Sequence, residues 1–171
     1  MDKEKLEDSI VKAFAYTENG GKPNINNPLK GKTGEMKSIF QFTPDTWKKD
    51  AKEVLGNENT PLTPDAETYV MKQKIKQWIK EGKSVSQMAS IHNAGNGEPD
   101  AYTGKFSDGS SSVGINKKYG VKFDVPNYAK KVLSYSKQFY NGDNSSSQEP
   151  SNSNSGDPLN SIISTIKSTT K

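Results

Sequence analysis

The sequence contains no cysteine and a single histidine, His92. The absence of cysteine excludes both a disulfide scaffold and a zinc site built on thiolates. One imidazole also argues against a metal site that relies on histidine ligands. We therefore expect this chain to work with neither a metal nor a cofactor.

Long apolar runs are absent as well. No segment approaches the length of a membrane-spanning helix, so we expect no membrane span. The first residues, Met1 to Lys5, are charged and lack the apolar stretch and cleavage site of a signal peptide. If the substrate lies outside a cell, we expect another component to carry the chain there.

Charge of one sign is only mildly in excess. The chain has 24 basic and 20 acidic residues, a formal net charge of +4. This balance suits contact with an anionic surface such as a teichoic-acid-bearing wall, and it equally suits a solvated lysine-rich surface. No block of Lys and Arg is interleaved with aromatic residues, which argues against nucleic acid as a partner.

Apolar residues make up 30% of the chain, and the shortage is uneven. Every aromatic residue precedes Asn141, after which Ser, Asn and Gly dominate. We therefore divide the chain into a folded domain over residues 1–142, a flexible Ser/Asn-rich linker over 143–157 and a short amphipathic helix over 158–171. In the last segment Leu159, Ile162, Ile163 and Ile166 have helical spacing. So short a helix is marginal alone in water, so it needs a partner surface or continues into a further domain.

Helical periodicity and capping signals predict a mostly α domain of the α+β type with long loops. Helices are expected over residues 2–17, from Thr43-Pro44-Asp45 to Gly56, from Thr63-Pro64-Asp65 to Gly82, from Ser84 to Gly95, and from Pro126 to Gly142. Residues 22–37 read as a loop that has room for a short irregular hairpin. Residues 97–123 read as a surface excursion, and no convincing strand pair is evident.

Four segments carry a resemblance to a known family. They are Tyr16-Thr17-Glu18-Asn19-Gly20-Gly21, the run from Ser38 to Trp47 (SIFQFTPDTW), Ile91 to Gly97 (IHNAGNG) and Val125 to Val132 (VPNYAKKV). In this order they resemble the soluble lytic transglycosylases of the lysozyme-like superfamily. The resemblance covers roughly Leu6 to Tyr140. It implies a lysozyme-like fold and cleavage of the β-1,4 bond between N-acetylmuramic acid and N-acetylglucosamine in peptidoglycan.

The resemblance makes Glu18 the catalytic acid, and its predicted place agrees with that role. Cleavage of a glycosidic bond needs a carboxylic acid that still holds its proton near neutral pH. Glu18 closes the first helix, where the helix dipole disfavours negative charge, and Phe14 and Tyr16 offer apolar surroundings. From its position at a helix end alone, Glu18 could equally be a solvated residue of a frayed helix. Its assignment as the acid therefore depends on the other three segments.

The same resemblance supplies substrate-binding candidates. Gln41 and Ser38 belong to the family's turn against the cleaved sugar, although Gln41 could equally cap the next helix. Asn93 and Ala94 match an Asn-Ala-Gly motif that could bind an N-acetyl group, or simply form a helix end. Tyr128 matches a late family tyrosine that approaches the catalytic Glu, and it could also be only a core residue. Tyr102 is added as a tyrosine that could stack on a sugar.

The chain also departs from the family pattern. Asn19 stands where Ser usually follows the catalytic Glu, Ser38 replaces a Gly, and His92 stands where a Tyr is frequent. The loop between Glu18 and Ser38 is longer than usual. Glu35, within that loop, is the main rival acid, although the neighbouring lysines favour a solvated carboxylate.

Two chemical outcomes are open. In a lytic transglycosylase Glu18 first protonates the bond and then, as a carboxylate, accepts the proton of the muramyl O6, giving a 1,6-anhydro product. In a muramidase water attacks, usually helped by a second carboxylate, and none is obvious. Asp45 reads as a first-turn helix residue, and Glu35 remains open as a second carboxylate. The missing partner favours the transglycosylase, and the non-enzymatic alternative is a wall-binding or structural phage tail component.

The expected setting follows from the same features. The partner is the peptidoglycan glycan strand, with other phage tail or secretion-apparatus proteins as further candidates through the C-terminal tail. We expect a virion, in particular a phage tail, or the extracellular cell wall as the location. A conjugation apparatus is the second choice.

Overall fold

The computed structural model describes residues 2–18, 29–31, 34–36, 38–117, 120–142, 159 and 163, without the side chains of 29–31, 34–36 and 121. Its helices are α1 (Lys3–Glu18), α2 (Pro44–Leu55), α3 (Pro64–Lys80), α4 (Val85–Ala94) and α5 (Val125–Asn141), with a 3₁₀ turn η1 (Ala101–Thr103). Two antiparallel hairpins pair β1 (Leu29–Gly31) with β2 (Gly34–Met36) and β3 (Val113–Asn116) with β4 (Val121–Asp124). The fold is thus mostly helical, as predicted.

Helix starts follow the capping signals in the sequence. The Thr43 hydroxyl accepts from the Thr46 amide and the Thr63 hydroxyl accepts from the Ala66 amide, each directly before a proline. Ser84 opens α4 with a reciprocal capping box to Gln87. These side chains satisfy amides that have no partner inside the helix, so the predicted bounds of α2, α3 and α4 are confirmed within a residue or two.

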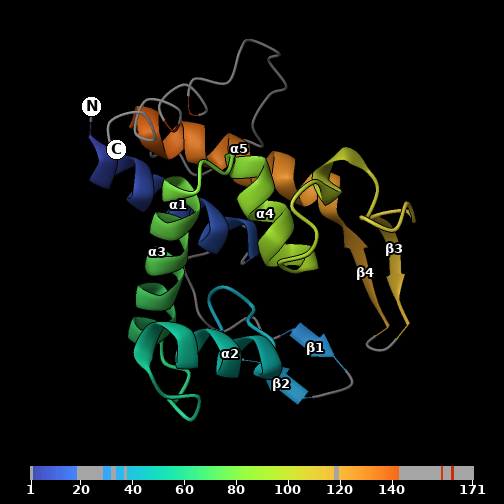
Figure 1. Cartoon of the computed structure of the whole chain (residues 1–171), viewed down its shortest axis with the longest axis horizontal. Coiled ribbons are helices and arrows are strands. Elements are labelled where there is room, and N and C mark those ends of the chain that lie inside the picture. The colour runs from blue at the N-terminus through green and yellow to red at the C-terminus, as the bar shows by residue number, and fades with distance from the viewer. Residues whose placement is uncertain are drawn as a thin grey trace.

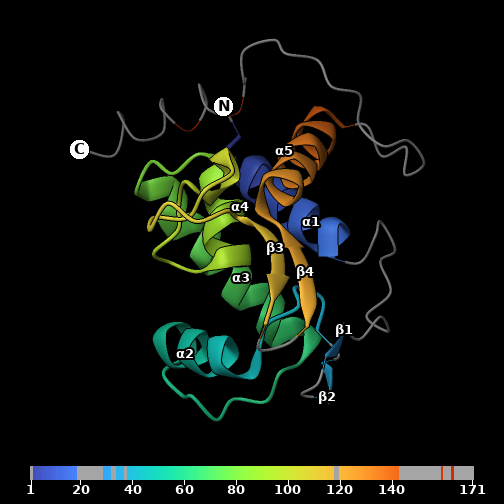
Figure 2. The same cartoon turned by 90° about the vertical axis from the view of Figure 1, so that its right-hand side faces the viewer.

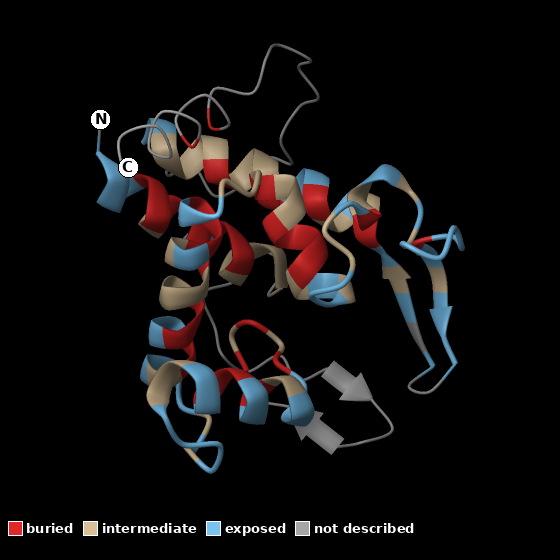
Figure 3. Ribbon diagram, in the orientation of Figure 1, coloured by how far each residue is buried: buried red, intermediate tan, exposed pale blue. Residues whose placement is uncertain are grey.

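Helices α1, α4 and α5 lie together, and α3 leads from them to α2 and the β1–β2 hairpin (Figure 1). Helix α1 packs against α5 and α3, while α4 packs against α5. The β3–β4 hairpin projects beside this body, on the flank where β1–β2 also lies (Figure 2). Buried residues line α1, α3 and α4, whereas much of α2 and of the β3–β4 hairpin faces solvent (Figure 3).

The core combines apolar faces from all five helices with two phenylalanines of the turn before α2. Its largest fully buried apolar side chains are Phe14, Phe40, Phe42, Leu6, Ile10, Met71, Ile75, Ile79, Met88, Leu159 and Val70. Because Phe40 and Phe42 flank Gln41, burying both rings fixes the position of the turn relative to α1 and α4.

The β3–β4 hairpin corrects the prediction of a strand-free excursion over residues 97–123. The Phe123 ring lies over Gly114, so closely that a Cβ there would come within 3.2 Å of it. Val113 and Ile115, on the other face, are 49% and 59% exposed. Each strand alternates over only four residues, VGIN and VKFD, within a segment rich in Gly, Ser and Asp, so the pattern is too short to predict a strand pair.

The C-terminal segment meets its partner surface within this chain. Leu159 and Ile163 are helical, 1% and 3% exposed, and belong to the main apolar cluster. Ile162, Ile166 and the predicted linker lie outside the described residues. The sequence predicts that the amphipathic tail needs an apolar surface. For Leu159 and Ile163, the core of the domain is that surface.

Leu159→Ala is expected to lower the free energy of unfolding by about 2–5 kcal/mol, because it removes a fully buried side chain from the cluster. Urea unfolding followed by tryptophan fluorescence measures the change. Val113→Ala, at a half-exposed position, is the control and is expected to change stability by less than about 0.5 kcal/mol. Equal effects of the two substitutions would show that Leu159 does not pack on the domain.

Candidate active site

Glu18 is the last residue of α1, and its side chain is 14% exposed. The Tyr128 hydroxyl, from the first turns of α5, donates a hydrogen bond of 2.6 Å to Glu18 Oε1. These two residues are 110 positions apart in the chain, and both were candidates from sequence. The packing of α1 against α5 brings them together.

Tyr128 remains a hydrogen-bond donor over the whole useful pH range. Burial raises the pKa of its hydroxyl well above the ordinary value of 10.0, and the nearby Glu18 carboxylate raises it further by charge and by hydrogen bonding. A phenol that keeps its proton offers that proton to Glu18 Oε1. It therefore fixes the orientation of the carboxyl group in the site.

His92, in the last turn of α4, approaches Glu18 from another side. Its Nε2 lies 2.9 Å from the Phe40 carbonyl oxygen and 3.6 Å from Glu18 Oε1. The Phe14 and Phe42 rings meet the imidazole edge to face. The imidazole thus lies between Glu18 and the turn that carries Gln41, with its hydrogen bond to the turn.

The turn of residues 38–42 holds Gln41 in an unusual backbone conformation. Its φ is 52°, in the left-handed region that side chains other than glycine rarely adopt. The side-chain amide of Gln41 donates through Nε2 to the Ser38 carbonyl oxygen at 2.7 Å. Thr43 caps α2, so the alternative in which Gln41 caps that helix is wrong. Strain of this kind is typical of residues held in place for function.

Glu67, on α3, accepts hydrogen bonds from this turn. It is fully buried, accepts the Ser38 hydroxyl at 2.6 Å and the Ile39 amide at 2.8 Å, and lies 3.5 Å from the Phe40 amide nitrogen. Burial raises its pKa, and these hydrogen bonds partly offset that rise. The carboxyl group thus takes the place of a backbone partner for a turn that belongs to no sheet.

Sequence reasoning missed Glu67, although a signal was present. Glu67 precedes Val70 and Met71 by three and four positions, which places it on the buried stripe of α3. A charged residue in a stripe that is otherwise apolar predicts a buried carboxylate with dedicated donors. The donors themselves lie 28 and 29 positions away and were not readable from the pattern.

Ser38 is buried, at 1% exposure. Its hydroxyl donates to Glu67 and accepts from the Phe42 amide at 3.2 Å. These bonds shape the turn from within, on the side away from solvent. The residue was a candidate for substrate binding, and the structure gives its side chain a place in the support of Gln41.

The remaining candidates surround this centre less directly. Asn93 is exposed and Ala94 half-buried at the end of α4, directly after His92. Tyr102 lies in η1, half-buried against the main cluster, with its amide bonded to Ser90 Oγ at 2.9 Å. Glu35 lies in β2, and its side chain is outside the described part of the structure.

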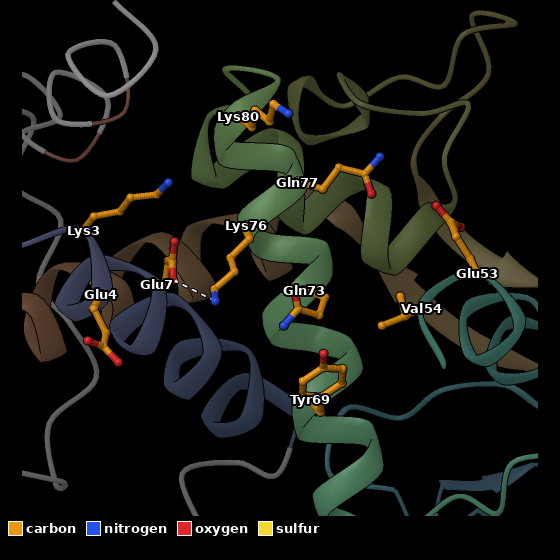
Figure 4. A pocket seen from close by; sticks show the side chains of 10 residues that line it. All are labelled: Lys3, Glu4, Glu7, Glu53, Val54, Tyr69, Gln73, Lys76, Gln77 and Lys80. Carbon is orange, nitrogen blue, oxygen red and sulfur yellow. Dashed lines mark ion pairs between the residues drawn. The ribbon is translucent and has the colours of Figure 1, made fainter. Parts of the chain in front are cut away.

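A separate groove of about 910 Å³ lies between α1, α3 and the end of α2. Figure 4 shows its mixed-charge lining, including the ion pair between Lys76 and the buried Glu7 at 3.9 Å. Burial raises the pKa of Glu7, against the lowering effect of the nearby lysines. None of the site candidates from the sequence lines this groove.

Across the described residues, no cluster of three or more His, Asp or Glu side chains could hold a metal ion. The same part of the chain contains no helix that is both long and apolar enough to span a bilayer. No protein-family model, curated protein or solved structure matches the sequence or fold of this chain. The geometry around Glu18 is therefore the basis on which a function can be assigned.

Proposed function

We propose that this chain has a lysozyme-like domain that cleaves the β-1,4 bond between N-acetylmuramic acid and N-acetylglucosamine in peptidoglycan. Glu18 is the acid. The observation that carries the proposal is the half-buried Glu18 carboxyl, held at Oε1 by the Tyr128 hydroxyl and flanked by the turn of Gln41. A partly desolvated carboxyl with a fixed orientation is what protonation of a glycosidic oxygen requires.

The hydrogen bond from Tyr128 assigns different tasks to the two carboxyl oxygens. Oε1 accepts the hydrogen bond from the Tyr128 hydroxyl and faces His92. The acidic proton is therefore carried by Oε2, which transfers it to the leaving oxygen of the sugar. After the bond breaks, the same oxygen is free to accept the proton of the muramyl O6, which closes on the anomeric carbon.

Three carboxylates on α2 and α3 have other contacts or positions, which favours this intramolecular route. Glu67 is fully buried and bonded to the turn, and Asp50 is buried and paired with Lys74. Asp45 is exposed in the first turn of α2. Among the described side chains, these three have structural roles or lie at a helix start. A mechanism in which the muramyl O6 replaces an activated water needs no second carboxylate.

Mass spectrometry of the products formed from purified peptidoglycan tests the proposal. We expect 1,6-anhydromuramyl ends, which lack one water relative to reducing ends. Reducing ends only would contradict the transglycosylase and leave the muramidase. Binding to the wall without any cleavage would favour the second alternative, a structural or wall-binding component.

A place in a larger assembly is part of this proposal. The net charge of +4 suits an anionic wall, and local wall digestion is needed by a phage tail during DNA entry and by a conjugation apparatus. We propose the phage virion first. Immunoblotting of purified phage particles and of the culture medium distinguishes a virion protein from a protein released outside the cell.

A further inference from the structure

His92 occupies a position that links the two halves of the site. Its side chain is 5% exposed, and its Nε2 lies 2.9 Å from the Phe40 carbonyl oxygen. A carbonyl oxygen can only accept a hydrogen bond, so Nε2 carries the hydrogen. The imidazole is thereby committed to the Nε2–H form, and its donor is directed at the turn of residues 38–42.

Aromatic rings restrict the imidazole on three sides. Phe14 from α1 and Phe42 from the turn meet it edge to face, with centroids 5.2 and 5.6 Å away. Tyr128 from α5 stacks on it at 6.4 Å. Such a cage leaves the ring little freedom to rotate. The position of Nε2 is therefore a fixed feature of the fold.

The same Nε2 lies 3.6 Å from Glu18 Oε1, the oxygen that also accepts from Tyr128. One nitrogen thus faces both the carbonyl next to Gln41 and the carboxyl of the acid.

We propose that His92 is a positioning residue whose Nε2–H donates to the Phe40 carbonyl and so holds the Gln41 turn beside Glu18 for glycan cleavage. The consequence for cleavage rests on the function proposed above. The titratable or charged groups around the ring are Glu18 from α1 and Tyr128 from α5, with Glu67 and Lys74 of α3 reaching the same turn. Of these, only Glu18 lies within ion-pair distance of His92 in the described structure.

Two variants test the hydrogen-bond donor. His92→Gln keeps an uncharged N–H donor, and His92→Phe keeps a ring without a donor. At pH 8 we expect kcat/KM on purified glycan strands to stay within about threefold of wild type for His92→Gln and to fall about tenfold for His92→Phe, the loss expected for one hydrogen bond. Equal losses in the two variants would overturn the role of the donor.

A measurement independent of activity keeps this proposal separate from the proposed function. His92 is the only histidine of the chain, so ¹⁵N imidazole NMR reports on this residue without assignment variants. We expect the Nε2–H form at pH 8 and a shifted Nε2 signal in Glu18→Gln, with no shift in the control Glu53→Gln on the exposed side of α2. An Nδ1–H form, or no response to Glu18→Gln, would overturn the bridge. The expected spectra in a protein without cleavage activity would instead reject the proposed function and leave the bridge standing.

Discussion

Glu18→Gln is expected to reduce glycan-strand cleavage by a factor of roughly 100 to 10,000, the usual contribution of a general acid. The amide keeps the shape of the side chain and an oxygen that accepts from Tyr128, but it carries no acidic proton. Release of soluble fragments from purified peptidoglycan, measured at several enzyme concentrations, gives the rate. Circular dichroism establishes that the variant is folded.

The matched control is Glu53→Gln, the same chemical change on an exposed residue of α2. We expect it to retain wild-type activity. Glu18→Gln should still bind the wall in a sedimentation assay, because its contacts with the sugar are preserved. Unchanged cleavage by Glu18→Gln would remove Glu18 as the acid and direct attention to Glu35.

Glu67→Ala is expected to lower the free energy of unfolding by about 3 kcal/mol or more, because the Ser38 hydroxyl and the Ile39 amide lose a buried acceptor. Cleavage should fall with it, since the turn that holds Gln41 at φ 52° loses its support. Urea unfolding and the cleavage assay measure the two effects. A turn that keeps its conformation without Glu67 would leave both quantities near wild type.

Two companion variants define the origin of that loss. Glu67→Gln keeps one acceptor oxygen, and we expect a loss of about 1–2 kcal/mol. Asp65→Ala, in the same first turn of α3 but exposed, should cost no more than about 1 kcal/mol through the helix dipole. A loss of stability that decreases from Glu67→Ala through Glu67→Gln to Asp65→Ala distinguishes a buried acceptor from a general effect at the helix start.

The pH dependence of stability provides a further check on Glu67. Because burial raises its pKa in the folded protein, the folded state binds the proton more tightly than the unfolded chain does. The stability that Glu67 contributes is therefore complete below the ordinary glutamate pKa. It is lost as the pH rises through the raised pKa of the folded protein. Wild type should lose stability with rising pH in that window, and Glu67→Gln should lose less.

Local signals made the helices readable from the sequence. Thr43, Thr63 and Ser84 are side chains whose partners lie three residues away, so α2, α3 and α4 could be placed without knowledge of the rest. The β3–β4 hairpin was missed because its strands, VGIN and VKFD, are only four residues long. Phe123 packs on Gly114 across the two strands, a contact that neither strand shows by itself.

For the site, the sequence by itself determined the identity and order of the main chemical groups: Glu18 at a helix end, Gln41 in a turn and Tyr128 on a late helix. It also determined that a short apolar tail needs an apolar surface. Only the tertiary structure decided that Tyr128 bonds Glu18, that His92 lies between Glu18 and the Phe40 carbonyl, and that Glu67 supports the turn. The physical reason is separation along the chain. Capping and periodicity act within a few residues, whereas these contacts join residues 27 to 110 positions apart and exist only after the helices pack.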